Sequence, residues 1–143
     1  MSWPAKLFAR LQVAWRRYRS LGARGERAAE KHLKRLGYQI VARRDRGRLG
    51  ELDLVAVDGR TLVFVEVKTR ISHSAGHPAE AVGAEKQARL TRLALAYLKR
   101  HDLLEHPARF DVVAITWPKD ARRPIIDHRQ NAFEAVGRGQ MFS

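Results

Sequence analysis

The stretch GELDLVAVDGRTLVFVEVKT (residues 50–69) contains two apolar runs that are separated by Asp58-Gly59. Glu51–Val57 and Thr61–Thr69 have the length and the β-branched content that are typical of strands, and an Asp-Gly pair between such runs is a strong signal for a hairpin. The second run is apolar on both faces over most of its length, which is typical of an interior strand. The stretch therefore predicts a hairpin whose second strand lies inside a larger sheet.

The predicted hairpin determines which acidic side chains share a face. With Asp58 and Gly59 as the two turn residues, Asp53 lies opposite Phe64, and Glu66 is its diagonal neighbour on the same face. The backbones of diagonal neighbours are about 7–8 Å apart, so one cation could bridge the two carboxylates. A loop with an odd number of residues would instead place Asp53 on the opposite face, because side chains alternate along a strand.

The remaining segments predict helices and strands around this hairpin. Residues at helical spacing form one stripe of a helix over residues 22–36, namely Glu26, Ala29, Leu33 and Leu36, and Gly37 ends that helix. The other expected elements are a strand over Tyr38–Val41, a basic loop over Arg43–Gly50, a loop over Ile71–Gly83, a helix over Ala84–His101 and strands over Arg109–Trp117 and Pro124–Asp127. This order predicts an α/β fold with a mixed central β-sheet flanked by helices.

Composition limits the class of protein. The chain has 143 residues, which fits one domain, and its 28 Lys and Arg against 15 Asp and Glu give a formal net charge of +13. The absence of cysteine excludes disulfides, cysteine zinc sites and thiol nucleophiles. No apolar run approaches the roughly 18 residues of a membrane span, and the start lacks a secretory apolar region, so we expect no stable membrane insertion and a cytoplasmic location. The charge favours nucleic acid as partner, with an anionic membrane surface second.

Much of the excess charge lies near the start of the chain. Residues 1–24 contain six Lys and Arg and no acid, and Trp3, Phe8, Leu11 and Trp15 recur at roughly helical spacing. We expect a basic amphipathic extension over residues 1–20, a domain over 21–136 and a loose tail over 137–143. The extension is compatible with packing on the domain, with phosphate binding and with an interfacial membrane helix, and it also resembles an organelle transit peptide.

Three ionisable residues of the hairpin carry the candidate chemistry. Glu66 and Lys68 lie on one face at the end of an apolar strand, where charged groups are rare unless they are paired or metal-bound. Together with Asp53 they suit metal-dependent phosphodiester hydrolysis, in which carboxylates and the Val67 carbonyl hold a divalent cation. Lys68 would orient water or offset charge on the phosphate in the transition state. Glu26 belongs to the same hypothesis, because it continues the apolar stripe of its helix.

Asp53…Glu66-Val67-Lys68, preceded by Glu26 on a helix, resembles the PD-(D/E)XK nuclease superfamily of restriction-endonuclease-like fold. Within that superfamily the chain is similar to archaeal Holliday-junction resolvases, because Gly37-Tyr38 matches their helix-ending pair and Glu26 matches their helix carboxylate. The resemblance implies that Asp53, Glu66 and Lys68 are catalytic and that Glu26 completes the metal site.

A narrower resemblance is to the YraN family of bacterial endonuclease-like proteins. It rests on Gly25-Glu26, on Gly50–Val55 and on Val63–Thr69, and it extends over roughly residues 22–135, with Leu52 where a proline often precedes the first acid. It implies Mg²⁺ or Mn²⁺ as cofactor and DNA as substrate, including branched or junction DNA, with DNA repair and recombination as compatible processes. A homodimer is also compatible, because junction resolvases cut two symmetric strands.

Further residues have two interpretations each. Glu51 shares the face of Asp53 and is either an accessory ligand or an exposed acid at a strand end. Gln87 is either a polar site residue or a helix cap. His73 and His77 favour a surface loop over a zinc pair. We expect phosphate contacts from five arginines, namely Arg43, Arg44, Arg46, Arg48 and Arg70.

Two other classes of function compete with an endonuclease. A nucleic-acid-binding module could retain the fold without turnover, since fold does not fix activity. An interaction protein could be recruited to a membrane or a partner through residues 1–20.

Overall fold

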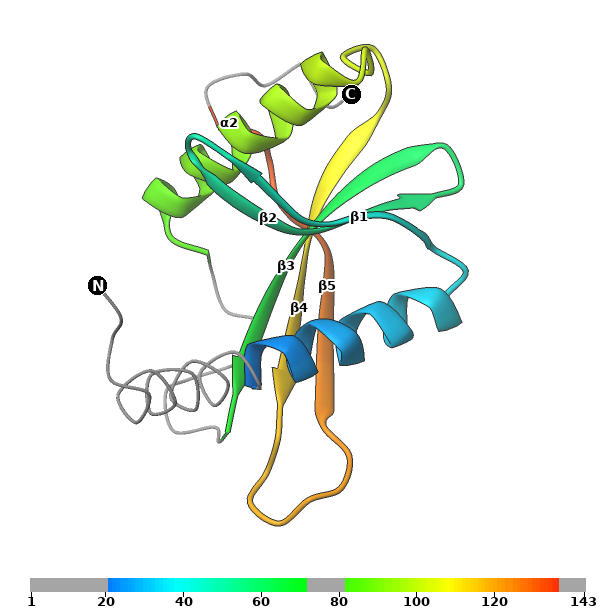
Figure 1. Cartoon of the computed structure of the whole chain (residues 1–143), viewed down its shortest axis with the longest axis vertical. Coiled ribbons are helices and arrows are strands. Elements are labelled where there is room, and N and C mark those ends of the chain that lie inside the picture. The colour runs from blue at the N-terminus through cyan, green and yellow to red at the C-terminus, as the bar shows by residue number, and fades with distance from the viewer. Residues whose placement is uncertain (1–20, 72–81, 137–143) are drawn as a thin grey trace, which may run out of the picture.

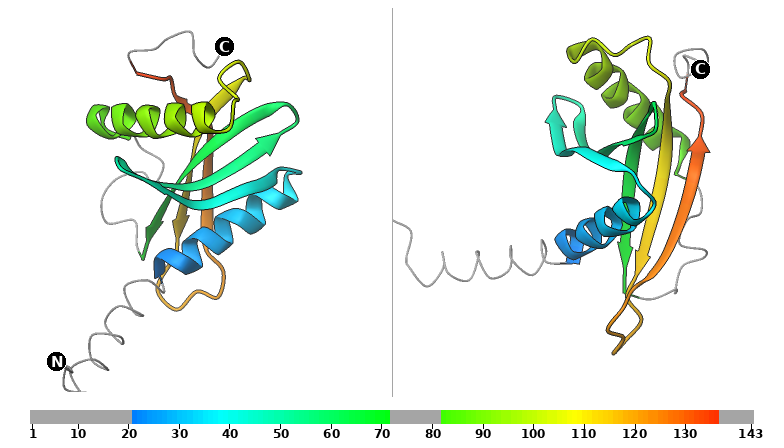
Figure 2. Two further views of the ribbon diagram at one scale, coloured as in Figure 1. Left: turned by 45° about the horizontal axis from the view of Figure 1, so that its top comes forward. Right: turned by 90° about the vertical axis from the view of Figure 1, so that its right-hand side faces the viewer.

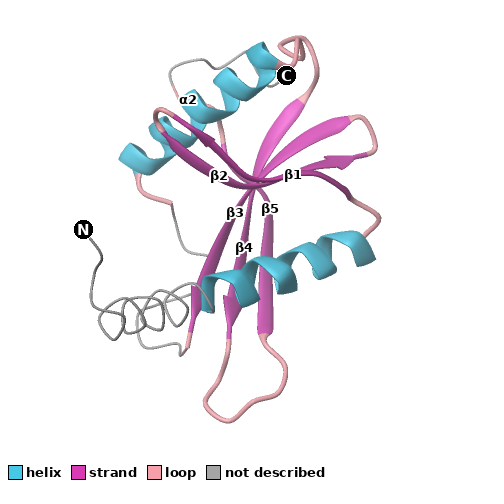
Figure 3. Cartoon of the chain, viewed as in Figure 1, coloured by secondary structure: helices cyan, strands magenta, loops and turns pink. Residues whose placement is uncertain are grey.

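The computed structural model describes residues 21–71 and 82–136 (Figure 1). A helix over residues 21–35 precedes three strands, and a second helix precedes two more. The labelled elements are β1 (Gln39–Gly47), β2 (Gly50–Asp58), β3 (Thr61–Arg70), α2 (Ala84–Arg100), β4 (Ala108–Thr116) and β5 (Ile125–Phe133). The predicted α/β class, a mixed sheet flanked by helices as in the restriction-endonuclease-like fold, is confirmed (Figure 3).

The strands form one sheet in the order β1-β2-β3-β4-β5. β3 and β4 are parallel, whereas the other neighbours are antiparallel, and α2 lies in the connection between the two parallel strands. Parallel neighbours need such a crossover because a tight turn cannot reverse the chain direction twice. Figure 2 shows that the sheet is strongly twisted and that the β1–β2 turn projects from it.

Two hydrophobic cores lie on opposite faces of this sheet, because alternate residues of β3 and β4 belong to different clusters. One core joins Phe64 and Phe110 to the apolar stripe of α2, which includes Leu98. The other joins Val63 and its neighbours to Ala29 and Leu33 of the helix over residues 21–35. The two helices therefore cover different faces of the sheet.

The β2–β3 turn differs from the predicted one. Asp58 pairs with Thr61, so the turn residues are Gly59 and Arg60, and Gly59 has φ 63°. A first turn position with positive φ is where a type II′ hairpin turn places glycine. In this register Phe64 pairs with Val55, so the predicted opposition of Asp53 and Phe64 is wrong, and the pairing of the two strands ends at Leu54↔Val65. Leu52 packs in the core beside α2, whereas Leu54 packs in the core beside the helix over residues 21–35, so the regular alternation of side chains is interrupted at Asp53. The common face predicted for Asp53 and Glu66 therefore does not follow from the register.

The two outer strands are longer than the sequence pattern predicted. The basic segment that was expected as a loop over Arg43–Gly50 is mostly part of β1, and only Arg48 and Leu49 form the turn before β2. The strand expected over Pro124–Asp127 continues to Phe133 as β5. Both segments are polar, and the ladder hydrogen bonds of β2 and β4 hold them in extended form without an apolar pattern.

Other predictions lie at element ends or outside the described residues. Leu36 is 51% exposed, contrary to its predicted place on the inward stripe. The helix ends at residue 35, and Gly37, with φ 92°, lets the Tyr38 N–H reach the Leu33 carbonyl. The extension over 1–20, the histidine pair of the 71–83 loop and the tail over 137–143 lie outside the described residues. In the part of the chain that is described, no helix is long and apolar enough to cross a membrane.

The helix over residues 21–35 crosses β3 closely at Gly25. A Cβ atom at this position would overlap the Thr69 hydroxyl and lie 3.0 Å from both Cβ and Cγ2 of Thr69. Gly25→Ala is therefore expected to lower the free energy of unfolding by about 1–3 kcal/mol, as overpacking does. Urea unfolding of Gly25→Ala, Thr69→Ala and the double variant measures this, and Thr69→Ala should relieve much of the loss. Equal losses with and without Thr69 would contradict the proposed contact.

Candidate functional site

Three carboxylates meet beside the N-terminal half of the helix over residues 21–35. Glu26 projects from this helix, whereas Glu51 and Asp53 project from alternate positions of β2. One oxygen of each lies within 4.8 Å of the others, and all three residues are partly buried. Such a set of oxygens is of the kind that Mg²⁺ and Mn²⁺ prefer. Glu51, which the sequence left open as an accessory ligand or an exposed acid, therefore lies within the cluster.

Asp53 is the most perturbed acid of the site. The Val67 N–H donates a hydrogen bond to Asp53 Oδ2 at 2.8 Å, which connects β2 to β3 beside Glu66. Burial, together with the negative charges of Glu66 and Glu26, raises the pKa of Asp53 to about 7, although the Val67 hydrogen bond and Lys86 act in the other direction. Asp53 is therefore partly protonated near neutral pH, and a cation bound beside it would favour the charged form.

Glu66 lies next to this cluster but outside its tightest part. Its side chain is buried, with 8% exposure, and it forms an ion pair with Lys86 of α2. Lys68 follows on the same strand, and burial lowers its pKa, with the nearby charges of Lys86 and Arg70 adding to the effect. The site thus combines four carboxylates with two lysines that approach from different elements.

Lys86 is a site residue that the sequence pattern did not single out. It lies in the first turn of α2, two residues after the helix begins, and only the packing of α2 on β3 brings it to Glu66. Gln87, the neighbouring candidate, uses its side-chain amide to donate to the Val82 carbonyl at 2.7 Å. That contact connects Gln87 to the segment before the helix but is not an N-cap, because a cap accepts from a backbone N–H and the N-cap residue Gly83 has no side-chain cap hydrogen bond.

Ion pairs with carboxylates hold several of the candidate arginines. Arg44 Nε lies 2.7 Å from Glu26 Oε2, and Arg46 Nη2 lies 3.5 Å from Glu51 Oε2. Arg43 forms a bidentate contact with Glu30, one helical turn beyond Glu26.

The remaining two arginines lie at the ends of strands. Arg48 is exposed in the β1–β2 turn, and Arg70 is the last residue of β3. Two of the candidate arginines, Arg44 and Arg46, therefore neutralise members of the cluster directly.

Arg44 adopts an unusual backbone conformation. Its φ is 49°, and it follows the β-bulge of β1 between Ile40 and Ala42. A non-glycine residue in the left-handed region costs of order 1 kcal/mol and persists only where its surroundings hold it. The side chain of Arg44 is held by its ion pair with Glu26. A hollow between the helix over residues 21–35 and β1 opens at this contact, lined by both residues and by Arg27 and Arg43.

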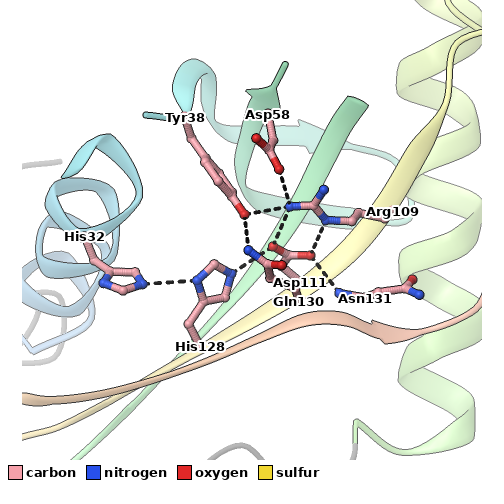
Figure 4. A network of polar contacts seen from close by, with 8 residues as sticks. All are labelled: His32, Tyr38, Asp58, Arg109, Asp111, His128, Gln130 and Asn131. Atoms are coloured by element: carbon pink, nitrogen blue, oxygen red, sulfur yellow. Dashed lines mark hydrogen bonds and ion pairs between the residues drawn. The ribbon is translucent and has the colours of Figure 1, made fainter. Parts of the chain in front are cut away.

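A second polar network lies away from the carboxylate cluster (Figure 4). Its centre is Asp111 of β4, which is 0% exposed and accepts hydrogen bonds from Arg109 Nε at 3.0 Å, His128 Nε2 at 2.8 Å and the Asn131 N–H at 3.0 Å. Burial acts to raise the pKa of Asp111, but these hydrogen bonds outweigh it and hold the pKa below its ordinary value. His32 contacts the other ring nitrogen of His128 at 3.1 Å.

This network connects the helix over residues 21–35, β2, β4 and β5. Arg109 also donates to Tyr38 Oη at 2.6 Å and to Asp58 Oδ2 at 3.0 Å. Asp58 therefore accepts a hydrogen bond at the end of β2, and it belongs to that strand and not to the turn. The polar groups satisfy one another and fix the elements around β4, so their role is structural.

Comparison with known proteins relates the chain to one family. The model of the uncharacterised protein family UPF0102 matches residues 25–115. A UPF0102 protein of Rhodopirellula baltica is 51% identical over 120 residues, covering 82% of this chain and 72% of that protein. A UPF0102 protein of Geobacter sulfurreducens is 52% identical over 115 residues, covering 80% and 88% of the two chains. The matched segment contains every member of the carboxylate cluster.

Proposed function

Because this chain belongs to the uncharacterised protein family UPF0102, whose name assigns no reaction, we propose a function from its own site. The protein acts as a Mg²⁺- or Mn²⁺-dependent endonuclease that hydrolyses phosphodiester bonds of DNA. The observation that carries the proposal is the meeting of Glu26, Glu51 and Asp53 within 4.8 Å, with the pKa of Asp53 raised to about 7.

The donor set fits a hard divalent cation. Three carboxylates from two elements provide oxygen ligands, and the fourth, Glu66, lies close enough to Asp53 to raise its pKa. Mutual repulsion among these acids is the electrostatic property that a divalent cation relieves. Glu26, Glu51 and Asp53 would hold the ion, with Glu66 and the Val67 carbonyl as additional ligands. When bound, the ion would polarise the phosphate and lower the pKa of water.

The remaining residues would bind and orient the phosphate. Lys86 pairs with Glu66, and Lys68 follows Glu66 on β3, so both could donate to phosphate oxygens or to the attacking water. The lowered pKa of Lys68 reduces the cost of transferring its proton to a leaving or bridging oxygen.

In this proposal Arg44 and Arg46 bind the nucleic-acid backbone once they leave the carboxylates. Both neutralise carboxylates of the cluster, so a divalent ion and these guanidinium groups compete for Glu26 and Glu51. An ion at the cluster would release the two arginines, which would then contact the nucleic-acid backbone beside it. Nucleic-acid affinity would therefore rise when the ion binds.

The direct test is cleavage by the purified protein of labelled four-way junction, flap, single-stranded and duplex DNA, and of RNA, in Mg²⁺, Mn²⁺ or EDTA. We expect cleavage only with metal, and the pattern of products identifies the preferred structure. A junction cut on two symmetric strands would also indicate that two copies act together. Thermal unfolding with and without Mn²⁺ reports ion binding independently of turnover, because a bound ion stabilises the folded state.

A non-catalytic nucleic-acid-binding module is the alternative. It is favoured by the pairing of Arg44 with Glu26 and of Lys86 with Glu66, since acids that are already neutralised by cations of the chain need no metal. Binding of DNA without cleavage in either metal would support this alternative and contradict the endonuclease.

A further inference from the structure

A basic hollow lies on the far flank of the helix over residues 21–35. Two of its cations, Lys31 and Arg35, come from that helix, and two, Arg122 and Arg123, come from the connection between β4 and β5. Ala28, Pro124 and Ile126 complete the lining. The connection lies at the lower end of the sheet in Figure 1, where the helix passes beside it.

The lining of this hollow contains no acidic side chain. Glu30 lines the adjoining hollow with Lys31 and Arg35, but within the described ranges none of the four cations forms an ion pair. On the other flank of the same helix, by contrast, Glu30 binds Arg43 and Lys34, and Glu26 binds Arg44. Four uncompensated cations around one concavity repel one another, and a bound anion relieves that repulsion.

The helix geometry relates the hollow to the carboxylate site. At 100° per residue, Arg35 lies about 180° around the helix from Glu26, and Lys31 about 140°. The two positions are thus separated by the helix itself, which is about 10–12 Å across, and by a rise of roughly 7–14 Å along its axis. A single phosphate cannot reach both, whereas a duplex with a rise of about 3.4 Å per base pair covers that distance within a few base pairs.

We propose that the basic hollow of Lys31, Arg35, Arg122 and Arg123 binds backbone phosphates of a nucleic-acid duplex that extends across the helix from the carboxylate site. This inference rests on the proposed function, because it assigns the hollow to the same substrate. The hollow contributes affinity and orientation and takes no part in the chemistry. Its contacts are with phosphates, so they are independent of base sequence.

The test compares pairs of substitutions that remove the same charge. Arg122→Ala/Arg123→Ala and Lys31→Ala/Arg35→Ala each remove two cations of the hollow, whereas Arg92→Ala/Lys99→Ala removes two exposed cations of α2, on the other face of the sheet. Fluorescence anisotropy with a duplex of about 20 base pairs, in EDTA and over a range of salt concentrations, gives the affinity and its salt dependence. Each hollow pair should bind about tenfold more weakly and lower the slope of log K against log salt by about 2, and the α2 pair should stay within about twofold.

The outcomes separate this inference from the endonuclease proposal. Equal effects of the hollow pairs and the α2 pair would overturn the inference, whether or not the protein cleaves DNA. Loss of duplex affinity in the hollow pairs without any metal-dependent cleavage by the parent protein would support the hollow and contradict the endonuclease alone. Binding of the same variants to vesicles that contain phosphatidylserine is measured in parallel. If the hollow pairs lose vesicle binding but retain duplex binding, the hollow binds a lipid surface and the inference is overturned.

Discussion

Asp53→Asn is expected to abolish metal-dependent cleavage and, at neutral pH without metal, to make the folded protein more stable. The loss of cleavage should be about 1,000-fold or more, because the substitution removes a central ligand of the proposed ion. DNA affinity measured in EDTA should stay within about threefold, since the arginines and lysines remain. The combination of higher stability and lost activity cannot arise from misfolding.

The stability effect follows from the direction of the Asp53 pKa shift. The pKa is about 7 in the folded protein, against about 3.9 in the unfolded chain, so the unfolded state releases this proton first as the pH rises. Below about pH 4 the group is protonated in both states and contributes nothing. Between pH 4 and 7 the parent protein loses stability, by up to about 1.4 kcal/mol per pH unit, and above pH 7 the loss is complete.

Urea unfolding at pH 5 and pH 8 in EDTA measures this effect. Asp53→Asn should gain a few kcal/mol over the parent protein at pH 8 and much less at pH 5. Asp102→Asn provides the matched control, because Asp102 is exposed, lies beyond α2 and has φ 56°, a conformation that asparagine tolerates. Lower stability of Asp53→Asn at pH 8 would contradict the assigned electrostatics, and cleavage at the parent rate would refute Asp53 as a metal ligand.

Asp111→Ala is expected to lower the free energy of unfolding by about 3–5 kcal/mol. The substitution leaves the Arg109 cation and the donors of His128 and Asn131 without their acceptor in the protein interior. A loss of this size is a large part of the total stability of a small domain, so the variant could be substantially unfolded. Urea unfolding followed by circular dichroism gives the value.

If the alanine variant does not fold, Asp111→Asn tests the same network, because asparagine keeps the shape of the side chain and removes its charge. The folded pKa of Asp111 lies below its ordinary value, so its contribution is present above the unfolded pKa of about 3.9 and is lost as the pH falls through the folded pKa. The stability difference between parent and Asp111→Asn should therefore narrow below about pH 4. Asp120→Asn, at an exposed site with φ 63°, is the control. A cost below about 1 kcal/mol for Asp111→Ala would show that the network does not hold the fold.

The sequence predicted the central hairpin well because alternation along a strand depends only on residue parity. The second strand was expected to be apolar on both faces, and Val63 and Phe64 do lie in opposite cores, although the turn lies one residue later than predicted. The burial of Ala29 and Leu33 followed in the same way from the helical period. Such periodicities are local, so they survive errors in turn position.

The parts that the sequence did not predict depend on contacts between distant segments. Lys86 reaches Glu66 only through the packing of α2, and Arg109 reaches Tyr38 across 71 residues of chain. Two partners of Asp111 come from β5, a strand whose polar sequence has no apolar pattern. Local patterns contain no information on these partners, because tertiary packing selects them.

The two irregular outer strands have a consequence for self-association. β1 has a bulge between Ile40 and Ala42, β5 pairs with a register shift between Phe110 and Val112 of β4, and left-handed residues interrupt both strands, Arg44 in one and Asn131 in the other. An incoming strand needs a regular row of free amide and carbonyl groups, and neither edge offers one along its whole length. The sheet is therefore protected against continuation into a second molecule, and against the fibrous assembly that such continuation allows. If two copies act on one DNA, side-chain surfaces must join them.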